Sequence, residues 1–114
     1  MCTQAKLNKI LGEVTQGVQK VLGARLRNII LFGSYARGDY DDESDIDIMV
    51  LADGTEEEIR ELDYELNWVS SDVSLENDIT VCIMLNDKTL FEQRLPILPF
   101  YRNVINDGVQ VYVN

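Results

Sequence analysis

Residues 31–50 read LFGSYARGDYDDESDIDIMV, and this stretch decides the fold. The apolar run that ends at Phe32 predicts a buried strand, which a Gly-Ser turn closes. Ten residues after that turn, a second strand begins at Asp45 with alternating polar and apolar residues. The alternation places Asp45 and Asp47 on one face, with Cα atoms about 6–7 Å apart. Because two such carboxylates repel each other, the pattern predicts a site for one divalent cation, or for two held about 3.5–4 Å apart.

The composition is that of a folded protein of modest size. The 114 residues are expected to form one domain, 1–114, and the 46% apolar and 26% charged residues argue against disorder. No apolar run is long enough to span a membrane, and no secretory leader pattern stands at the N-terminus. Cys2 and Cys82 lack metal-ligand spacing and are expected to be unpaired thiols. These features together predict a cytoplasmic protein.

Net charge and the missing histidine exclude several functional classes. The formal net charge is −10, which argues against tight binding to a nucleic-acid backbone because such binding needs clustered Lys and Arg. The sequence contains no histidine, so Ser-His-Asp catalysis, Cys-His catalysis and ordinary zinc sites are excluded. Any chemistry falls to carboxylates, hydroxyls and arginines.

The chain as a whole predicts an α+β fold, a mixed β-sheet with helices packed on it. Apolar residues at helical spacing predict an amphipathic helix at the N-terminus, and Thr55 with Glu58 forms a capping-box pattern for a second long helix. The predicted elements are a helix over 3–22, strands over 28–32 and 45–50, a helix over 55–70, a strand over 78–85, short helices over 87–94 and 100–106, and a last strand over 109–113 on an edge.

The lengths of the connections predict how three of these strands are oriented. The link over 33–44 is short, which favours an antiparallel pair, whereas a helical crossover between the second and third strands favours a parallel pair. With these directions, the end of the first strand and the starts of the second and third strands meet at one edge of the sheet. The Gly-Ser turn, Asp45 and Asp78 are therefore expected to lie close together.

This group of residues suits phosphate and metal chemistry. Gly33 lets a phosphate approach the backbone, and Ser34 can offer it a hydroxyl and an amide. Arg37 can reach the same anion with its forked guanidinium. Asp45 and Asp47 would hold Mg²⁺, which prefers oxygen ligands and substrate phosphates. In this arrangement Asp78 would complete the metal site or accept a proton, and the whole predicts transfer from a nucleoside triphosphate to a hydroxyl with two metal ions.

On these residues the chain resembles the nucleotidyltransferase superfamily that includes DNA polymerase beta, and specifically its minimal single-domain branch. Gly33-Ser34, ten residues and then Asp45-Ile46-Asp47 match the family signature, and the segment over 99–105 resembles the family more loosely. The resemblance implies that Asp45 and Asp47 are metal ligands, that Gly33 and Ser34 form the phosphate turn, and that Asp78 is the third carboxylate.

The third carboxylate has other candidates. Asn77 precedes Asp78, where the family usually has an apolar residue, so Asp72 and Glu76 remain open as alternatives. Asp41, Asp42 and Glu43 are expected to be solvated loop charges.

The resemblance also implies a donor and a partner. Minimal members of this family are often encoded beside a helical protein of the HEPN class and act as its antitoxin, and some transfer AMP to a hydroxyl of that protein. The resemblance therefore implies that ATP is the donor, Mg²⁺ the cofactor and a HEPN-type partner the acceptor. Two alternatives stay open: a non-catalytic antitoxin that inhibits by binding, and a small-molecule nucleotidyltransferase completed by a partner or by homo-oligomerisation. A receiver-type signalling domain is disfavoured because Phe32 and Gly33 stand where it would need acidic residues.

Overall fold

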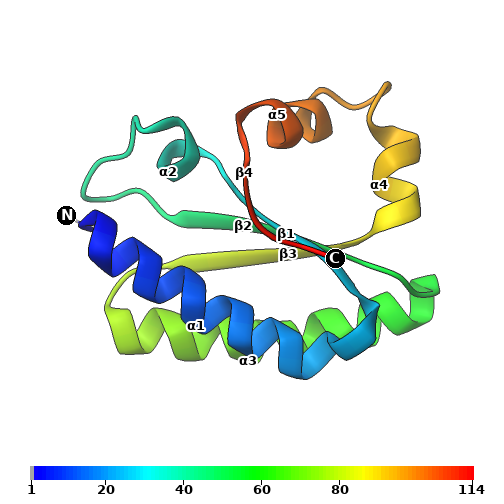
Figure 1. The fold of residues 1–114 in the computed structure, drawn as a ribbon, viewed down its shortest axis with the longest axis horizontal. Coiled ribbons are helices and arrows are strands. Elements are labelled where there is room, and N and C mark those ends of the chain that lie inside the picture. Colours follow the sequence, from blue (N-terminus) through cyan, green and yellow to red (C-terminus); the bar gives the residue numbers. More distant parts are fainter. Residues whose placement is uncertain (1) are drawn as a thin grey trace.

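A computed structural model describes residues 2–114 as one four-stranded mixed sheet with helices on both faces (Figure 1). The strand order is β3-β2-β1-β4. The elements in chain order are α1 (Gln4–Leu22), a 3₁₀ turn (Gly23–Arg25), β1 (Leu26–Phe32), α2 (Ser34–Arg37), β2 (Ile46–Ala52), α3 (Glu56–Asn77), β3 (Val81–Asp87), α4 (Lys88–Arg94), α5 (Pro99–Asp107) and β4 (Val109–Val113). The predicted α+β class is confirmed.

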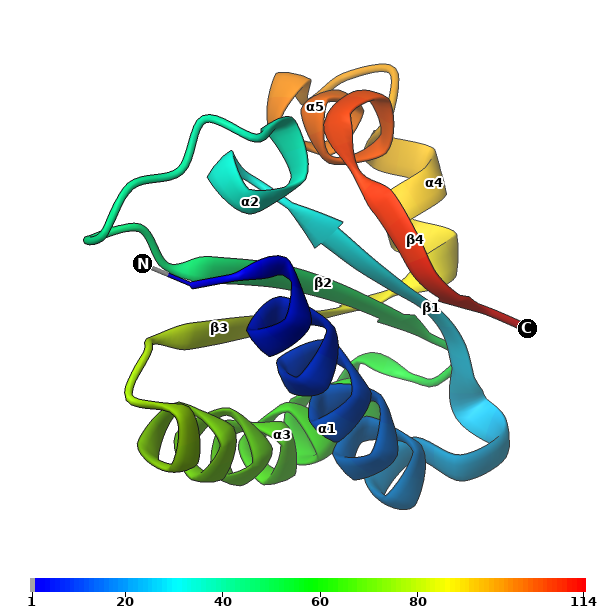
Figure 2. The same ribbon diagram turned by 60° about the vertical axis from the view of Figure 1, so that its left-hand side comes forward.

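The strand directions are those that the connection lengths predict. β1 pairs antiparallel with β2 and with β4, and β2 pairs parallel with β3. β3 and β4 are the two edge strands. As a result, the C-terminal end of β1 and the N-terminal ends of β2 and β3 lie side by side where these three strands meet the α2 end of the sheet (Figure 2).

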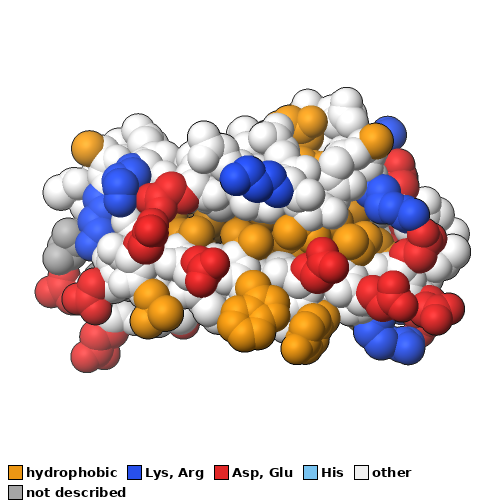
Figure 3. All heavy atoms as spheres, turned by 90° about the horizontal axis from the view of Figure 1, so that it is seen from below, with side chains coloured by type: hydrophobic (Ala, Val, Ile, Leu, Met, Phe, Trp, Pro, Cys, Tyr) orange, Lys and Arg blue, Asp and Glu red, His pale blue; other side chains and the backbone are white. Residues whose placement is uncertain are grey.

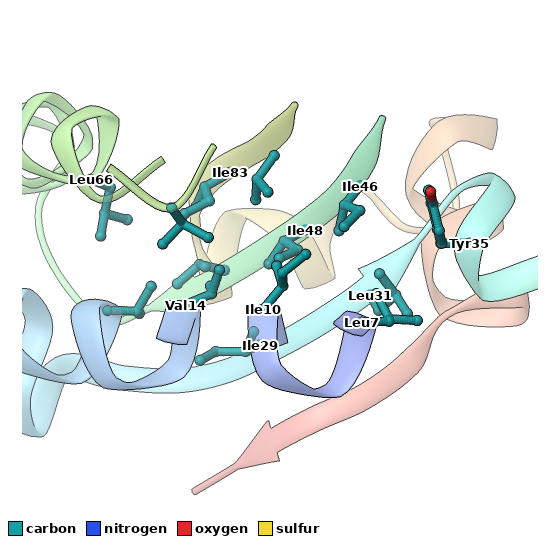
Figure 4. Close-up of a cluster of buried hydrophobic side chains, with 14 of the residues drawn as sticks. Leu7, Ile10, Val14, Ile29, Leu31, Tyr35, Ile46, Ile48, Leu66 and Ile83 are labelled. Carbon is teal, nitrogen blue, oxygen red and sulfur yellow. The ribbon is translucent and has the colours of Figure 1, made fainter. Parts of the chain in front are cut away.

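The two faces of the sheet have separate apolar cores. α1 and α3 cover one face, where buried residues from these helices meet alternate residues of the central strands, among them Ile10, Leu66 and Ile48 (Figure 4). α4 and α5 cover the other face, where Phe91 and Val104 pack on Met49. Because side chains alternate along a strand, Asp47, two residues before Met49, points to this second face.

Two predicted boundaries around α3 are wrong. The helix continues to Asn77 and does not stop near residue 70, because Val73 and Asn77 are buried and continue its inner side. β3 begins at Val81 and not at Asp78. Asp78 adopts a left-handed conformation with φ of 51° and terminates the helix, so it belongs to the turn before the strand. Within the residues described, no helix is both long and apolar enough to cross a membrane.

Candidate active site

The centre of the site is the junction between β1 and α2. β1 ends at Phe32, whose register partner on β2 is Asp47. Gly33 then turns the chain with φ of 73° and ψ of −156°, a conformation that is essentially restricted to glycine. A Cβ on Gly33 would lie 2.5 Å from Oδ2 of Asp47. Glycine is therefore required here both by the backbone conformation and by the carboxylate that lies against it.

α2 directs polar groups toward this turn. Ser34 is its first residue, and the amides at the start of a helix have no carbonyl partner within that helix. The carbonyl of Gly33 accepts hydrogen bonds from the amides of Ala36 and Arg37, at 3.1 Å each, which fixes the turn. Arg37 follows one turn after Ser34, and its Nε lies 3.2 Å from Oδ2 of Asp39. Ser34 and Arg37 are thus held on the same side of the Gly33 turn.

The loop between α2 and β2 is internally bonded, although its residues are mostly exposed. The Ser44 hydroxyl accepts a hydrogen bond from the Asp41 amide at 2.9 Å, and Asp41 Oδ1 accepts one from the Glu43 amide at 2.9 Å. Tyr35 and Tyr40 stack with ring centroids 4.2 Å apart. These contacts set the path by which the chain enters β2. Asp41, expected to be only a solvated charge, also shapes this turn.

Asp45 and Asp47 lie at the start of β2 with the predicted two-residue spacing. Asp45 is exposed just before the strand, and Asp47 is half-buried within it. Burial raises the pKa of Asp47, the negative charge of Asp45 raises it further, and the guanidinium of Arg37 opposes the rise. The pair therefore has too little positive charge around it. A cation beside it would offset the cost of burying the Asp47 charge and would reduce the repulsion between the two carboxylates.

The carboxylate pair fits Mg²⁺ as a ligand set. Mg²⁺ is commonly held by one or two carboxylates together with substrate phosphates and waters, so two protein ligands suffice. Within residues 2–114, no third Asp, Glu, Cys or His joins the pair in a group able to hold a metal ion. When bound, Mg²⁺ would neutralise phosphate charge beside Asp45 and Asp47.

The structure does not bring Asp78 to the pair. Its position three residues before β3 places it in a separate cavity lined by Ser74, Leu75 and Thr80. The residue of β3 that stands beside Asp47 in register is Cys82. Burial and then the charges of Asp45 and Asp47 raise the pKa of the Cys82 thiol. A role for Asp78 as third carboxylate remains a prediction without a supporting contact. Asp72 and Glu76, the alternatives, line a different cavity between α1 and α3.

A cavity of about 340 Å³ opens beside the Gly33 turn and collects the predicted phosphate-binding residues. Gly33, Ser34, Arg37 and Asp47 form one side of it. α5 supplies the other side, with Phe100, Asn103, Val104 and Asp107. Pockets for small molecules are usually about 300–1,000 Å³, so this cavity is of a size for a nucleotide.

The contribution of α5 was not foreseen from the sequence. Phe100 is 43% exposed and packs edge-on against Phe32, with ring centroids 5.7 Å apart. Phe100, Asn103 and Asp107 share the i, i+3, i+7 spacing of one helix face, which is a sequence signal for a common side. That signal does not say which part of the molecule the face meets, because α5 reaches the Gly33 turn only through the tertiary fold.

A larger cavity, about 590 Å³, lies between α3 and β3. Its lining contains Ser70, Ser71 and Ser74 from the helix, Thr80 from the turn before β3 and Cys82 from the strand, with no carboxylate among its lining residues. The smaller cavity is the better candidate for nucleotide chemistry because it combines the carboxylate, the arginine and the glycine turn.

Comparison with known proteins agrees with this geometry. The sequence model of the nucleotidyltransferase domain family matches residues 7–109. The chain belongs to the nucleotidyltransferase domain family. Two relatives from Methanocaldococcus jannaschii share the name "Putative protein adenylyltransferase". One is 32% identical over 104 residues, which cover 91% of this chain and 96% of the relative. The other is 34% identical over 103 residues, which cover 90% and 96%.

Solved structures share the nucleotidyltransferase fold. A "putative nucleotidyltransferase" from Sulfolobus solfataricus superposes with a TM-score of 0.67 at 24% identity, covering 97% of this chain and 84% of that chain. A toxin-antitoxin structure with AMP-PNP gives a TM-score of 0.56 at 22% identity, covering 91% and 73%. A complex of a tri-AMPylated Shewanella oneidensis HEPN toxin with an MNT antitoxin gives a TM-score of 0.53 at 20% identity, covering 94% of this chain and 72% of that chain. At these identities the likeness concerns the fold.

Proposed function

We propose that this nucleotidyltransferase moves AMP from ATP to a hydroxyl of a partner protein in a Mg²⁺-dependent reaction. The observation that carries the proposal is the close approach of the Gly33 turn to Asp47, which supports a phosphate-binding role for this turn beside the carboxylate pair. The names of the two Methanocaldococcus jannaschii relatives support a protein acceptor. The toxin-antitoxin structures of the same fold support a helical HEPN-type partner and an antitoxin role.

Each residue has a distinct part in the proposed reaction. Ser34 and Arg37 would bind the triphosphate, and Asp45 and Asp47 would hold Mg²⁺ against it. The exposed ring of Phe100 offers a surface on which a nucleobase can stack. The acceptor oxygen bonds to the α-phosphorus, the bond from that phosphorus to the β-phosphate oxygen breaks, pyrophosphate leaves and the hydroxyl proton is released.

A binding-only antitoxin is the second candidate, because among residues 2–114 no third Asp, Glu, Cys or His joins Asp45 and Asp47 in a group that could hold a metal ion. It would neutralise its partner without any transfer. A small-molecule nucleotidyltransferase completed by a partner or by dimerisation is a further alternative from the sequence.

The test is label transfer from α-³²P-ATP to the partner protein. With Mg²⁺ and a HEPN-type protein encoded beside this chain, label is expected on a partner hydroxyl together with one pyrophosphate per AMP moved. γ-³²P-ATP is the matched control and should leave the partner unlabelled, because its label departs with pyrophosphate. Neutralisation of the partner without label from α-³²P-ATP would contradict transfer and support the binding-only antitoxin.

A further inference from the structure

α3 carries a row of large apolar side chains on the side that faces away from the core. Tyr64, Trp68 and Leu75 are 66%, 62% and 82% exposed. Their spacing of four and seven residues aligns them along one side of a helix with 3.6 residues per turn. Figure 3 shows hydrophobic side chains in a row along this lower face of the molecule, with Asp and Glu side chains around them. These three residues form the α3 stripe.

Such a row calls for an explanation, because single exposed apolar residues are common but aligned aromatic ones are not. Buried α3 residues such as Leu66 and Val73 already supply the contact with the sheet and α1. The stripe lies on the opposite side of the helix and adds nothing to that core. Tyr and Trp are also the side chains most enriched at the centres of protein interfaces.

The stripe has a different chemical border on each side. Toward α1 stand acidic residues: Asp72 and Glu76 line the cavity between α1 and α3, and Glu61 and Glu65 line one beside Arg25. Toward β3 stand Ser70, Ser71 and Ser74, which line the cavity of about 590 Å³. Over its whole length α3 carries eight carboxylates and one basic residue, Arg60. The complement of this surface is apolar along its centre and basic along one flank.

The occupant is a helix and not an added strand, because α3 already blocks the neighbouring sheet edge. The amide of Val81 on β3 donates to the Ser74 hydroxyl at 2.9 Å, and the Val81 carbonyl accepts from Ser70. Burial raises the pKa of Asp63, and the amide of Leu85, which donates to the Asp63 carboxylate, offsets part of that rise. Two of the outward-facing positions of β3 are thus already bonded, which leaves little room for β-strand addition.

A second copy of this chain is a poor occupant. An antiparallel two-fold dimer through the α3 stripe would place each acidic flank against the same flank of its mate, and in either orientation two chains with a net charge of −10 each would meet. Like charges opposed across an interface are strongly unfavourable. A basic partner would instead be attracted by the negative charge of this flank.

We propose that the α3 stripe is the docking surface for a basic amphipathic helix of the partner protein. The inference rests on the proposed function in one respect, that the acceptor is a protein. A helix bound here would lie beside the cavity of about 590 Å³, whose lining includes Cys82, the register neighbour of Asp47. Docking on α3 would therefore keep the acceptor protein next to the carboxylate pair, on the side away from the Phe100 cavity.

The test uses Trp68 itself as the reporter, because it is the only tryptophan in the chain. The probe is a synthetic Trp-free peptide of Leu and Lys, with Leu at helical spacing on one face. Its controls are a scrambled peptide of the same composition and a Leu-Glu version. The Leu-Lys peptide is expected to shift Trp68 emission to shorter wavelength and to saturate, whereas the two controls should not.

Matched variants locate the binding. Leu75→Glu is expected to weaken the affinity for the Leu-Lys peptide at least tenfold. Ile97→Glu should leave the affinity unchanged, because Ile97 is equally open at 72% exposure but lies between α4 and α5. Glu61→Gln with Glu65→Gln should reduce the affinity and its salt dependence, and Glu92→Gln on α4 should not. All five substituted positions are exposed, so the variants are expected to fold, which circular dichroism checks.

Several outcomes overturn the docking surface. They are an unshifted Trp68 spectrum, equal binding of the scrambled peptide, and full affinity in Leu75→Glu. Sedimentation that shows a dimer of the wild type, lost in Leu75→Glu, would assign the stripe to a second copy and also overturn it. None of these measurements uses ATP or Mg²⁺, so a failure here is distinct from a failure of AMP transfer.

Discussion

Asparagine in place of Asp45 or Asp47 is expected to reduce AMP transfer by about 10³-fold or more. A metal ion that neutralises phosphate charge in the transition state supplies several kcal/mol, and each 1.36 kcal/mol is a factor of ten in rate. Asn is close to Asp in shape, so the fold should persist while the charge proposed to hold the cation is lost. The measurement is the rate of pyrophosphate release with α-labelled ATP and the partner protein.

The matched control for this loss is Glu43→Gln. It removes one carboxylate two residues from Asp45, in the loop where the Glu43 backbone, and not its side chain, bonds to Asp41. Its transfer rate is expected to stay within about twofold of wild type, since nothing places that side chain at the site. Undiminished transfer in both Asp variants would show that the metal site lies elsewhere.

Alanine in place of Gly33 is expected to have the second largest effect. Its φ of 73° and ψ of −156° cost a residue with a side chain about 1–3 kcal/mol, and the new Cβ would lie 2.5 Å from Oδ2 of Asp47. The carboxylate must move to make room, so both the folding free energy and the site are affected. We expect a loss of about 1–3 kcal/mol of stability in urea unfolding and at least a tenfold loss of affinity for AMP-PNP with Mg²⁺ by calorimetry.

Gly38→Ala separates these two effects. Gly38 also has a positive φ, 86°, but no atom lies within 4 Å of the Cβ that the substitution adds. The variant should lose about 1 kcal/mol of stability from backbone strain and keep its nucleotide affinity. Equal loss of affinity in the Gly33 and Gly38 variants would mean that the contact with Asp47 has no special role.

The sheet was predictable because its signals are local. The alternation after Asp45 and the length of the link from Gly33 depend only on nearby residues, and together they determine the direction of β2 and the placement of Asp45 and Asp47 on one face. The start of α3 was predictable for the same reason, because the capping box between Thr55 and Glu58 involves only neighbouring residues. Hydrogen bonds from Thr55, and then the ion pair with Arg25, lower the pKa of Glu58 to about 2.

Two features depend on tertiary contacts and could not be placed correctly from the sequence. Asp78 looked like a strand residue because apolar residues follow it, yet buried Val73 and Asn77 extend α3 and leave Asp78 in the closing turn. Phe100 faces the site only because α5 folds back over the β1 end, which no pattern within α5 encodes. Sequence periodicity shows which residues share one face of a helix or strand, but it does not show which other element that face contacts.

The pKa of Asp47 links the site to stability. Burial and Asp45 raise it above its ordinary value of 3.8, so the folded protein holds this proton more tightly than the unfolded chain does. In acid below that value Asp47 is protonated in both states and contributes nothing. As the pH rises through the unfolded and then the folded pKa, stability is lost. Asp47→Asn escapes this loss, so the metal-free variant should be the more stable protein at neutral pH, with the difference vanishing in acid.

Thermal unfolding of wild type and Asp47→Asn at neutral pH, with and without Mg²⁺ and AMP-PNP, tests the metal site most directly. Without ligands, the variant is expected to melt roughly 4–8 °C higher, since relief of the burial of the Asp47 charge and of its repulsion with Asp45, after solvent screening, is worth about 1 kcal/mol. With ligands, the wild type should gain stability, because a ligand that binds only the folded state raises it by mass action, and the variant should lose most of that gain. Parallel melting curves for the two proteins, with the same response to Mg²⁺ and AMP-PNP, would make Asp47 an ordinary surface charge and contradict the assignment.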